Sequence, residues 1–143
     1  ALSVTIEGMP LLYGGQEAAL DKRLAFFEKD TISWENLELS NFYKRLFQLK
    51  KDNQALWNGN YGGKIDIISS KKDSLGFSFI RKKEANKVIS IFNLSEDNIQ
   101  LELNSEDLKG TYTSFFSGDE KVFQENENID LAPWDFQIYT NKK

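Results

Sequence analysis

The sequence predicts a mostly β protein, an antiparallel β-sandwich preceded by one strand and one helix of a β/α unit. After residue 63, short runs of alternating apolar and polar residues are separated by polar turns, with no helical period between them. Before residue 58 there is instead one continuous apolar run and one helical apolar stripe. A chain of 143 residues is long enough for one domain with an appendage and too short for two full domains.

The first expected element is a strand over residues 9–13. Its residues, Met9-Pro10-Leu11-Leu12-Tyr13, contain nothing strongly polar and are bracketed by glycines. A run that is apolar on both faces is typical of a strand buried in a parallel sheet. Because a parallel strand needs neighbours on both sides for its hydrogen bonds, we expect this segment to be the end of something larger.

A helix is expected after an irregular loop over residues 21–36. Asn36 and Ser40 are both candidate N-caps, and the helix should end near Asn53, where Lys50 and Lys51 suit the negative end of the helix dipole. Four of the side chains in its stripe, at positions 42, 43, 46 and 49, are large enough that leaving them exposed would cost much of the net stability of a domain. In this chain we expect the helix to lie against the sandwich or a second copy, with Trp57 beside it. The stripe consists of Leu39, Phe42, Tyr43, Leu46 and Leu49.

Seven strands are expected in the remainder, with Ile65, Ile67, Leu75, Phe77 and Phe79 facing one core. Basic residues in the first hairpins are interpreted as protection of an exposed strand edge. These residues are Lys71, Lys72, Arg81, Lys82, Lys83 and Lys87. The expected strands cover residues 64–69, 75–81, 87–93, 99–103, 111–116, 121–124 and 136–140.

Composition excludes several classes of function. The chain has no cysteine and no histidine, which excludes zinc fingers, thiol nucleophiles and histidine-dependent triads. Acid and base chemistry is left to carboxylates, lysine or tyrosine. A net charge of −4 argues against nucleic acid or an anionic membrane as a partner. Apolar runs of about five residues are far shorter than the ~20 that span a membrane.

The string Gly8-Met9-Pro10-Leu11-Leu12-Tyr13-Gly14-Gly15-Gln16-Glu17 resembles the Gly-x-Pro-Leu-x-Tyr-x-Gly-Gln-Glu segment on the eighth barrel strand of the α-amylase family, glycoside hydrolase family 13. A Phe-Phe-acidic-Lys-Asp stretch leading to Trp34, and a helix closing with Asn53-Gln54-Ala55-Leu56, follow in the order of that family. The final Leu131-Ala132-Pro133-Trp134-Asp135-Phe136 is similar to its approach to the last strand. The resemblance is specific over residues 8–57 and generic over 63–143.

The resemblance implies that residues 1–57 are the end of a catalytic (β/α)8 TIM barrel and that residues 58–143 are the C-terminal β-sandwich domain. In that family, the nucleophile aspartate, the acid/base glutamate and a third aspartate lie upstream of residue 1. No catalytic residue is therefore expected in this chain. The whole enzyme to which this chain would belong, here called the parent, would hydrolyse α-glucans such as starch or maltooligosaccharides. Residues 1–143 would stabilise its catalytic barrel.

Three residues are predicted to form the structural rim of the barrel, Gly15, Gln16 and Glu17. By the resemblance they support the site rather than catalyse, and Gly14 departs from the aromatic or Asn common there, leaving the rim locally bare. The acidic pairs at 96–97 and 106–107 are interpreted as solvated turns rather than calcium ligands. No cofactor or metal is expected in this stretch, although the resemblance allows calcium in the parent.

An alternative function is a non-catalytic carbohydrate-binding sandwich. Trp57, Tyr61 and Trp134 would then stack on sugar rings, whereas the competing interpretation is that they anchor the joint between barrel and sandwich. The expected partners are the missing catalytic barrel, the α-glucan substrate in the parent, and a second copy through the exposed barrel remnant. The cellular location is not indicated by the sequence.

Overall fold

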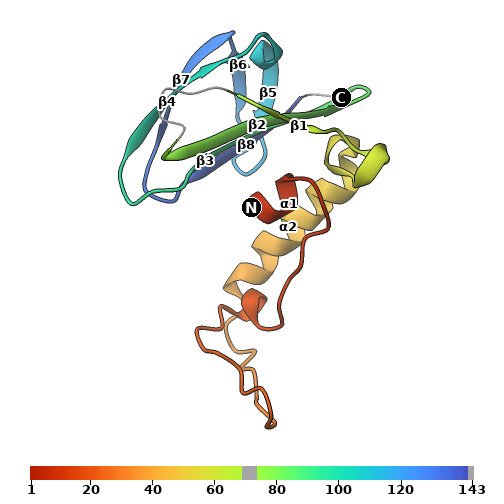
Figure 1. The fold of residues 1–143 in the computed structure, drawn as a ribbon, viewed down its shortest axis with the longest axis vertical. Helices are drawn as coiled ribbons and strands as arrows, with labels where there is room; N and C mark the ends of the chain where they lie inside the picture. The colour runs from red at the N-terminus through yellow and green to blue at the C-terminus, as the bar shows by residue number, and fades with distance from the viewer. Residues whose placement is uncertain (69–73, 142–143) are drawn as a thin grey trace.

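A computed structural model describes residues 1–68 and 74–141 and arranges them in three layers (Figure 1). A six-stranded sheet forms the middle layer, a two-stranded sheet covers one of its faces, and helices cover the other. The helices are α1 (Leu2–Thr5) and α2 (Glu38–Asp52), with short 3-10 turns η1 (Gln16–Ala18), η2 (Gln54–Leu56), η3 (Gly59–Tyr61) and η4 (Glu106–Leu108). No helix of the described chain is long and apolar enough to cross a membrane.

The strands pair in an antiparallel manner in both sheets, which confirms the predicted sandwich. The middle sheet has the order β1-β2-β3-β8-β5-β6, and the outer sheet pairs β4 with β7. All seven predicted strands are found, with shifted ends, and β7 is an addition; Ser69, Lys71 and Lys72 lie outside the described residues. The strands are β1 (Ile65–Ile67), β2 (Gly76–Lys83), β3 (Asn86–Asn93), β4 (Ile99–Asn104), β5 (Gly110–Ser114), β6 (Glu120–Phe123), β7 (Asn126–Leu131) and β8 (Phe136–Asn141).

The middle sheet is buried on both faces. Ile80 of β2 lies opposite Ile89 of β3, and both face the β4–β7 sheet. Val88 of β3 and Ile138 of β8 face the helices instead. Both faces are covered because successive side chains of a strand point to opposite sides of the sheet.

The prediction of one core for Ile65, Ile67, Leu75, Phe77 and Phe79 is wrong. Leu75 packs against the core between the sheets, whereas Phe79 points to the opposite face from its neighbour Ile80. Ile67 remains 66% exposed, since the helices do not extend over β1. The predicted alternation along the strands is correct, but the helices form a second covering layer. Residues that face the helices and residues that face the β4–β7 sheet are therefore both buried.

Helix α2 packs against the middle sheet through the predicted stripe. Leu46 and Leu49 are buried together with Val88 and Ile138. The prediction that Asn36 or Ser40 is the N-cap is wrong, because Leu37 holds that position and makes no side-chain capping bond. Asn36 lies just before it, and its Oδ1 accepts a hydrogen bond of 2.9 Å from the N–H of Glu38, the first residue of the helix. The expected contact of the helix with the sandwich is therefore confirmed within one copy of the chain.

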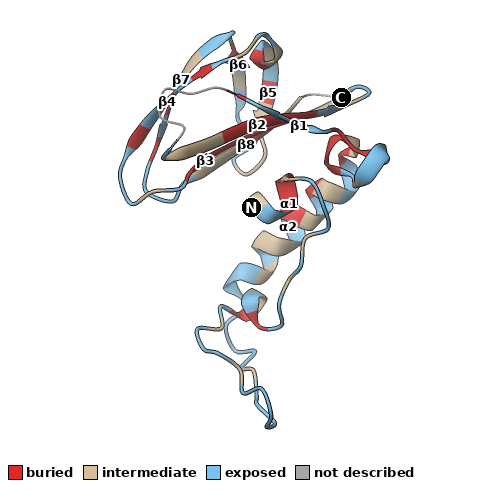
Figure 2. Cartoon of the chain, viewed as in Figure 1, coloured by how far each residue is buried: buried red, intermediate tan, exposed pale blue. Residues whose placement is uncertain are grey.

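The strand expected over residues 9–13 is not formed. Met9 and Leu11 are more than 80% exposed, at 81% and 83%, and this segment runs alongside α2 without a ladder (Figure 1). The physical reason is that a parallel strand requires strands on both sides for its hydrogen bonds. Every strand of the described residues belongs to an antiparallel sheet, so this segment has no such neighbours. We call residues 7–37 the arm; Figure 2 shows that it is mostly exposed.

Candidate functional site

The predicted rim residues lie in a tight turn of the arm, where η1 packs against α2. The N–H of Tyr13 donates to Gln16 Oε1 at 2.9 Å, and the N–H of Gln16 donates back to Tyr13 O at 3.1 Å. Gly15 has φ of +97°, and a Cβ there would lie 2.8 Å from Leu20 Cδ2. Only glycine suits both the backbone and the space, so this turn depends on Gly15.

Glu17 is half-buried where η1 packs against α2. Its Oε2 atom is buried and has no hydrogen-bond partner among the described residues. Buried polar atoms are almost always hydrogen-bonded in complete proteins. The structure thus brings Gly15, Gln16 and Glu17 together in one turn. One carboxylate oxygen of Glu17 is left without a hydrogen bond among the described residues.

Asp30 organises the loop of the arm, a role that the sequence analysis missed. Its carboxylate accepts hydrogen bonds from Lys22 Nζ at 2.7 Å, from the N–H of Ala25 at 3.0 Å and from the N–H of Thr31 at 2.7 Å. These bonds, with that of Lys22 the largest cause, lower the pKa of Asp30 to about 2. The only signal in the sequence was an aspartate within the Phe-Phe-acidic-Lys-Asp stretch.

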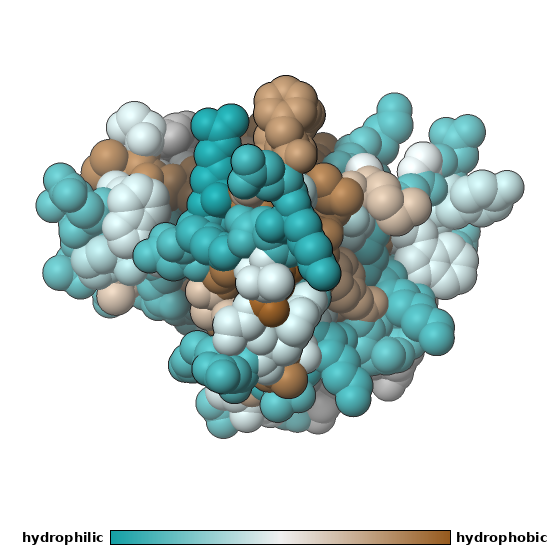
Figure 3. Space-filling view, turned by 90° about the horizontal axis from the view of Figure 1, so that it is seen from below, coloured by the Kyte–Doolittle hydropathy of each residue, from teal (hydrophilic) through white to brown (hydrophobic). Residues whose placement is uncertain are grey.

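Large apolar side chains on the arm are exposed, and we call them the arm surface. Phe26 and Phe27 meet edge to face with ring centroids 4.8 Å apart, yet they are 87% and 93% exposed. Seen from the end of the arm, hydrophobic groups (brown) lie at the surface between hydrophilic ones (teal) (Figure 3). Such concentrations of exposed apolar side chains mark interaction surfaces. The arm surface consists of Met9, Leu11, Tyr13, Phe26, Phe27, Trp34 and Leu37.

Arg81 joins the start of the chain to the sandwich. It is 1% exposed, and its guanidinium donates to backbone carbonyls of three segments: Gly63 O (2.8 Å), Thr5 O (3.2 Å) and Ile6 O (3.0 Å), Leu56 O (3.3 Å) and Trp57 O (2.8 Å). Burial lowers the pKa of this group. The interpretation of Arg81 as protection of a sheet edge is wrong, because β2 is an interior strand.

Lys50 is a second cation at the same joint. Its Nζ donates to Leu56 O at 2.7 Å and to Val4 O at 3.4 Å. Burial, and secondarily the charge of Arg81, lowers the pKa of Lys50 to about 8. Two neighbouring cations therefore bind carbonyls at the ends of α1 and η2, where the helix dipole favours positive charge.

Stability should respond to the titration of Lys50. Because the pKa of Lys50 is about 8 in the folded chain and 10.5 ordinarily, the folded chain releases this proton first. The contribution of Lys50 to the free energy of unfolding should therefore rise between pH 8 and 10.5. Urea unfolding at about pH 7 and about pH 9.5 should show this rise in the native chain and not in Lys50→Met; parallel profiles would contradict it.

The other singled-out residues are dispersed. Trp57 lies beside α2 as expected, since its indole N–H donates to Lys51 O at 3.0 Å. Tyr61 and Trp134 are 75% and 66% exposed. Asp107 pairs with Lys82, and no group of three or more acidic residues in the described parts of the chain could hold a metal ion.

Known proteins resemble this chain in sequence. Alpha-amylase 2 of Dictyoglomus thermophilum is 26% identical over 127 residues, covering 80% of this chain and 20% of the amylase. Oligo-1,6-glucosidase IMA5 of Saccharomyces cerevisiae is 29% identical over 104 residues, covering 71% of this chain and 16% of the glucosidase. No family model matches the chain.

Solved structures show the same fold. The maltogenic α-amylase AmyB of Thermotoga neapolitana has a TM-score of 0.79 at 17% identity, covering 98% of this chain and 34% of AmyB. AmyP in complex with maltose has a TM-score of 0.73 at 14% identity, covering 97% of this chain and 32% of AmyP. An Anoxybacillus α-amylase has a TM-score of 0.71 at 22% identity, covering 98% of this chain and 31% of the amylase. The chain thus spans about a third or less of the proteins that it matches.

The fold and the arm together define a β-sandwich with helical segments docked on one face, as found in α-amylases. The sequence relatives and the structural neighbours confirm the resemblance of this chain to a C-terminal region of glycoside hydrolase family 13 enzymes.

Proposed function

We propose that this chain is the C-terminal part of an α-amylase-type enzyme acting on α-glucans, in which it stabilises the catalytic barrel and contributes no catalytic carboxylate. The observation that carries the proposal is the arm surface, which exposes large apolar side chains although the arm is fixed to a well-packed sandwich. Covering each such side chain contributes roughly 1.5–3 kcal/mol. The relatives support the strands of a catalytic barrel as the partner that covers the arm surface.

Two further observations support a barrel partner. The unsatisfied Glu17 Oε2 lies in the rim turn, where donors from neighbouring barrel strands would meet it. The segment at residues 9–13 is apolar and runs beside α2 without a strand partner, and parallel barrel strands on both sides would supply its hydrogen bonds. The names of the sequence relatives, an α-amylase and an oligo-1,6-glucosidase, supply the substrate class.

The test is a chimera in which this chain replaces the matching segment of the Dictyoglomus amylase. Starch hydrolysis should be retained by the chimera and lost when Leu11→Asp and Phe27→Asp are introduced together, because charges on the arm surface oppose packing. The isolated chain should hydrolyse neither starch nor a chromogenic maltooligosaccharide, since retaining hydrolysis needs two carboxyl groups flanking the scissile bond.

The matched control is Val122→Asp, which places the same charge on an exposed apolar residue (61% exposed) of β6. It should leave the activity of the chimera unchanged. Turnover by the isolated chain that disappears in Glu17→Gln would contradict the proposal, as would a chimera indifferent to charges on the arm surface.

The second candidate is a carbohydrate-binding module. Trp134 favours it, because it is exposed and holds φ of +58°, a conformation that side chains other than glycine rarely adopt. Under this alternative the chain binds insoluble starch by itself, and Trp134→Ala abolishes that binding.

A further inference from the structure

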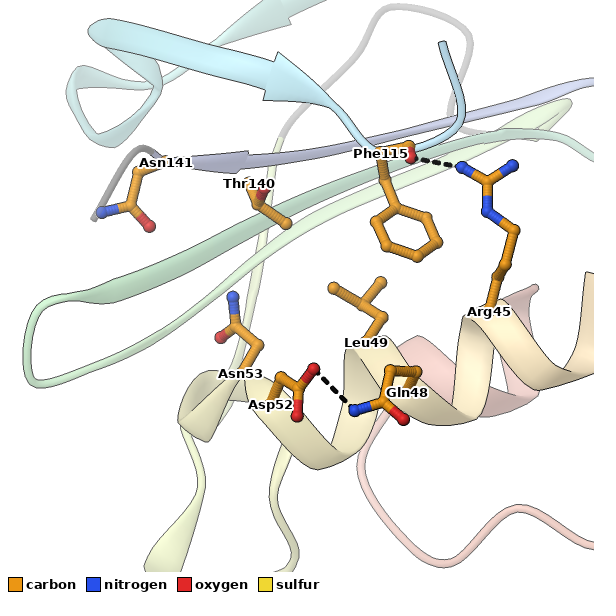
Figure 4. A pocket seen from close by; sticks show the side chains of 8 residues that line it. All are labelled: Arg45, Gln48, Leu49, Asp52, Asn53, Phe115, Thr140 and Asn141. Carbon is orange, nitrogen blue, oxygen red and sulfur yellow. Dashed lines mark hydrogen bonds between the residues drawn. The ribbon is translucent and has the colours of Figure 1, made fainter. Parts of the chain in front are cut away.

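A cleft of about 410 Å³ lies between the second half of α2 and strand β8 (Figure 4). Leu49 of α2 and Phe115, just after β5, form its apolar wall. Polar groups come from both sides: Arg45, Gln48 and Asp52 from the helix, and Thr140 from the sheet. The volume falls in the range of about 300–1,000 Å³ that is typical of small-molecule sites.

The polar groups of this cleft are held in place by the chain itself. Arg45 Nη2 donates to Phe115 O at 2.8 Å and to Phe116 O at 3.1 Å, and its guanidinium lies 4.8 Å from the centroid of the Phe116 ring. Gln48 Nε2 donates to Asp52 Oδ2 at 2.7 Å, which fixes the carboxylate at the C-terminal end of α2, away from Arg45. Groups fixed before binding lose little entropy when a ligand arrives.

Some hydrogen-bonding capacity remains. The hydrogen bonds of Arg45 use only Nη2, so Nε and Nη1 have no hydrogen-bond partner among the described residues. The Thr140 hydroxyl likewise has no hydrogen bond within the described parts of the chain. The cleft therefore offers donors from a guanidinium and a group that can both donate and accept.

The chemistry of the cleft selects a neutral ligand. One guanidinium and one carboxylate cancel, which gives no net preference for an anion or a cation. Donors and acceptors at the edge, combined with an apolar wall from Phe115 and Leu49, match a ring with hydroxyl groups around its edge and C–H groups on its face. We propose that this cleft binds a glucose unit of an α-glucan chain; the choice of α-glucan rests on the proposed function.

The test is an NMR titration of the isotope-labelled chain with maltotriose, with cellotriose and inorganic phosphate as comparison probes. Maltotriose should shift the Arg45 Nε–H and Gln48 side-chain amide signals in a saturable manner. Gln48→Leu and Thr140→Val should each weaken this binding roughly tenfold, the effect of about one hydrogen bond. Gln100→Leu and Trp134→Ala, which lie outside the cleft, should leave it unchanged.

Several outcomes would overturn the inference: no saturable shift, shifts centred on Trp134, unchanged affinity in both cleft variants, or equal binding of cellotriose. Tighter binding of phosphate at Arg45 would overturn it as well, because the cleft would then be an anion site. The proposed function is tested separately by the chimera. An active chimera whose cleft binds no maltotriose rejects this inference alone, whereas cleft binding with an inactive chimera rejects only the barrel-stabilising function.

Discussion

Replacing Arg81 by methionine will lower the free energy of unfolding by about 3–5 kcal/mol. Methionine fills much of the same space, but it leaves the carbonyls of Gly63, Thr5 and Trp57, among others, without their donor. Each buried acceptor left unsatisfied costs about 1–3 kcal/mol, and water reaching the edge of the joint offsets part of that cost. Urea unfolding measures the loss, and hydrogen exchange should increase in residues 1–6 and 54–63.

Lys83→Met is the matched control for Arg81→Met. Lys83 is on the same strand and donates one hydrogen bond, to Asn60 O at 2.9 Å, so its replacement should cost less than about 1 kcal/mol. Arg81→Lys should fall between the two, because an ammonium keeps the charge and cannot reach three segments at once. Equal effects of Arg81→Met and Lys83→Met would show that Arg81 does not hold the joint.

Truncating Leu46 to alanine should cost about 2–5 kcal/mol. Leu46 is fully buried between α2 and the middle sheet, so the change removes apolar contacts and leaves a cavity that the packed surroundings fill only in part. The measurement is chemical denaturation of the purified chain, with circular dichroism to follow the helix.

Leu39→Ala makes the same chemical change on the same helix at a residue that is 37% exposed. It should cost less than about 1 kcal/mol. If Leu46→Ala costs less than about 0.5 kcal/mol, as at a surface site, then the helix does not pack on the sandwich in solution.

Regular periodicity made most of the elements predictable. The stripe containing Leu46 and Leu49 identified α2, and short alternating runs identified seven strands. Strand β7 was missed because only Ile129 and Leu131 of its six residues are buried, and Asn126, Glu127 and Asn128 before them are typical of a turn. A strand in a two-stranded outer sheet needs few apolar residues, so its signal is weak.

Contacts between distant segments could not be predicted in this way. Arg81 stands in the sequence beside Lys82 and Lys83, but only the fold places Thr5 and Trp57 around its guanidinium. The rim residues Gly15, Gln16 and Glu17 were found because they are contiguous. The cleft at Arg45 was not found, because Phe115 and Thr140 line it from parts of the sequence far from Arg45.

The position of β8 in the middle sheet has a consequence for how the chain is made. Strand β8 lies between β3 and β5, although β3 leaves the ribosome long before it. Until β8 is synthesised, the nascent β2–β3 hairpin carries an unpaired edge along Val88, Ile89 and Phe92 and apolar side chains on both faces. Such intermediates aggregate readily, so synthesis that stalls before Phe136 should leave a chain that depends on chaperones to remain soluble.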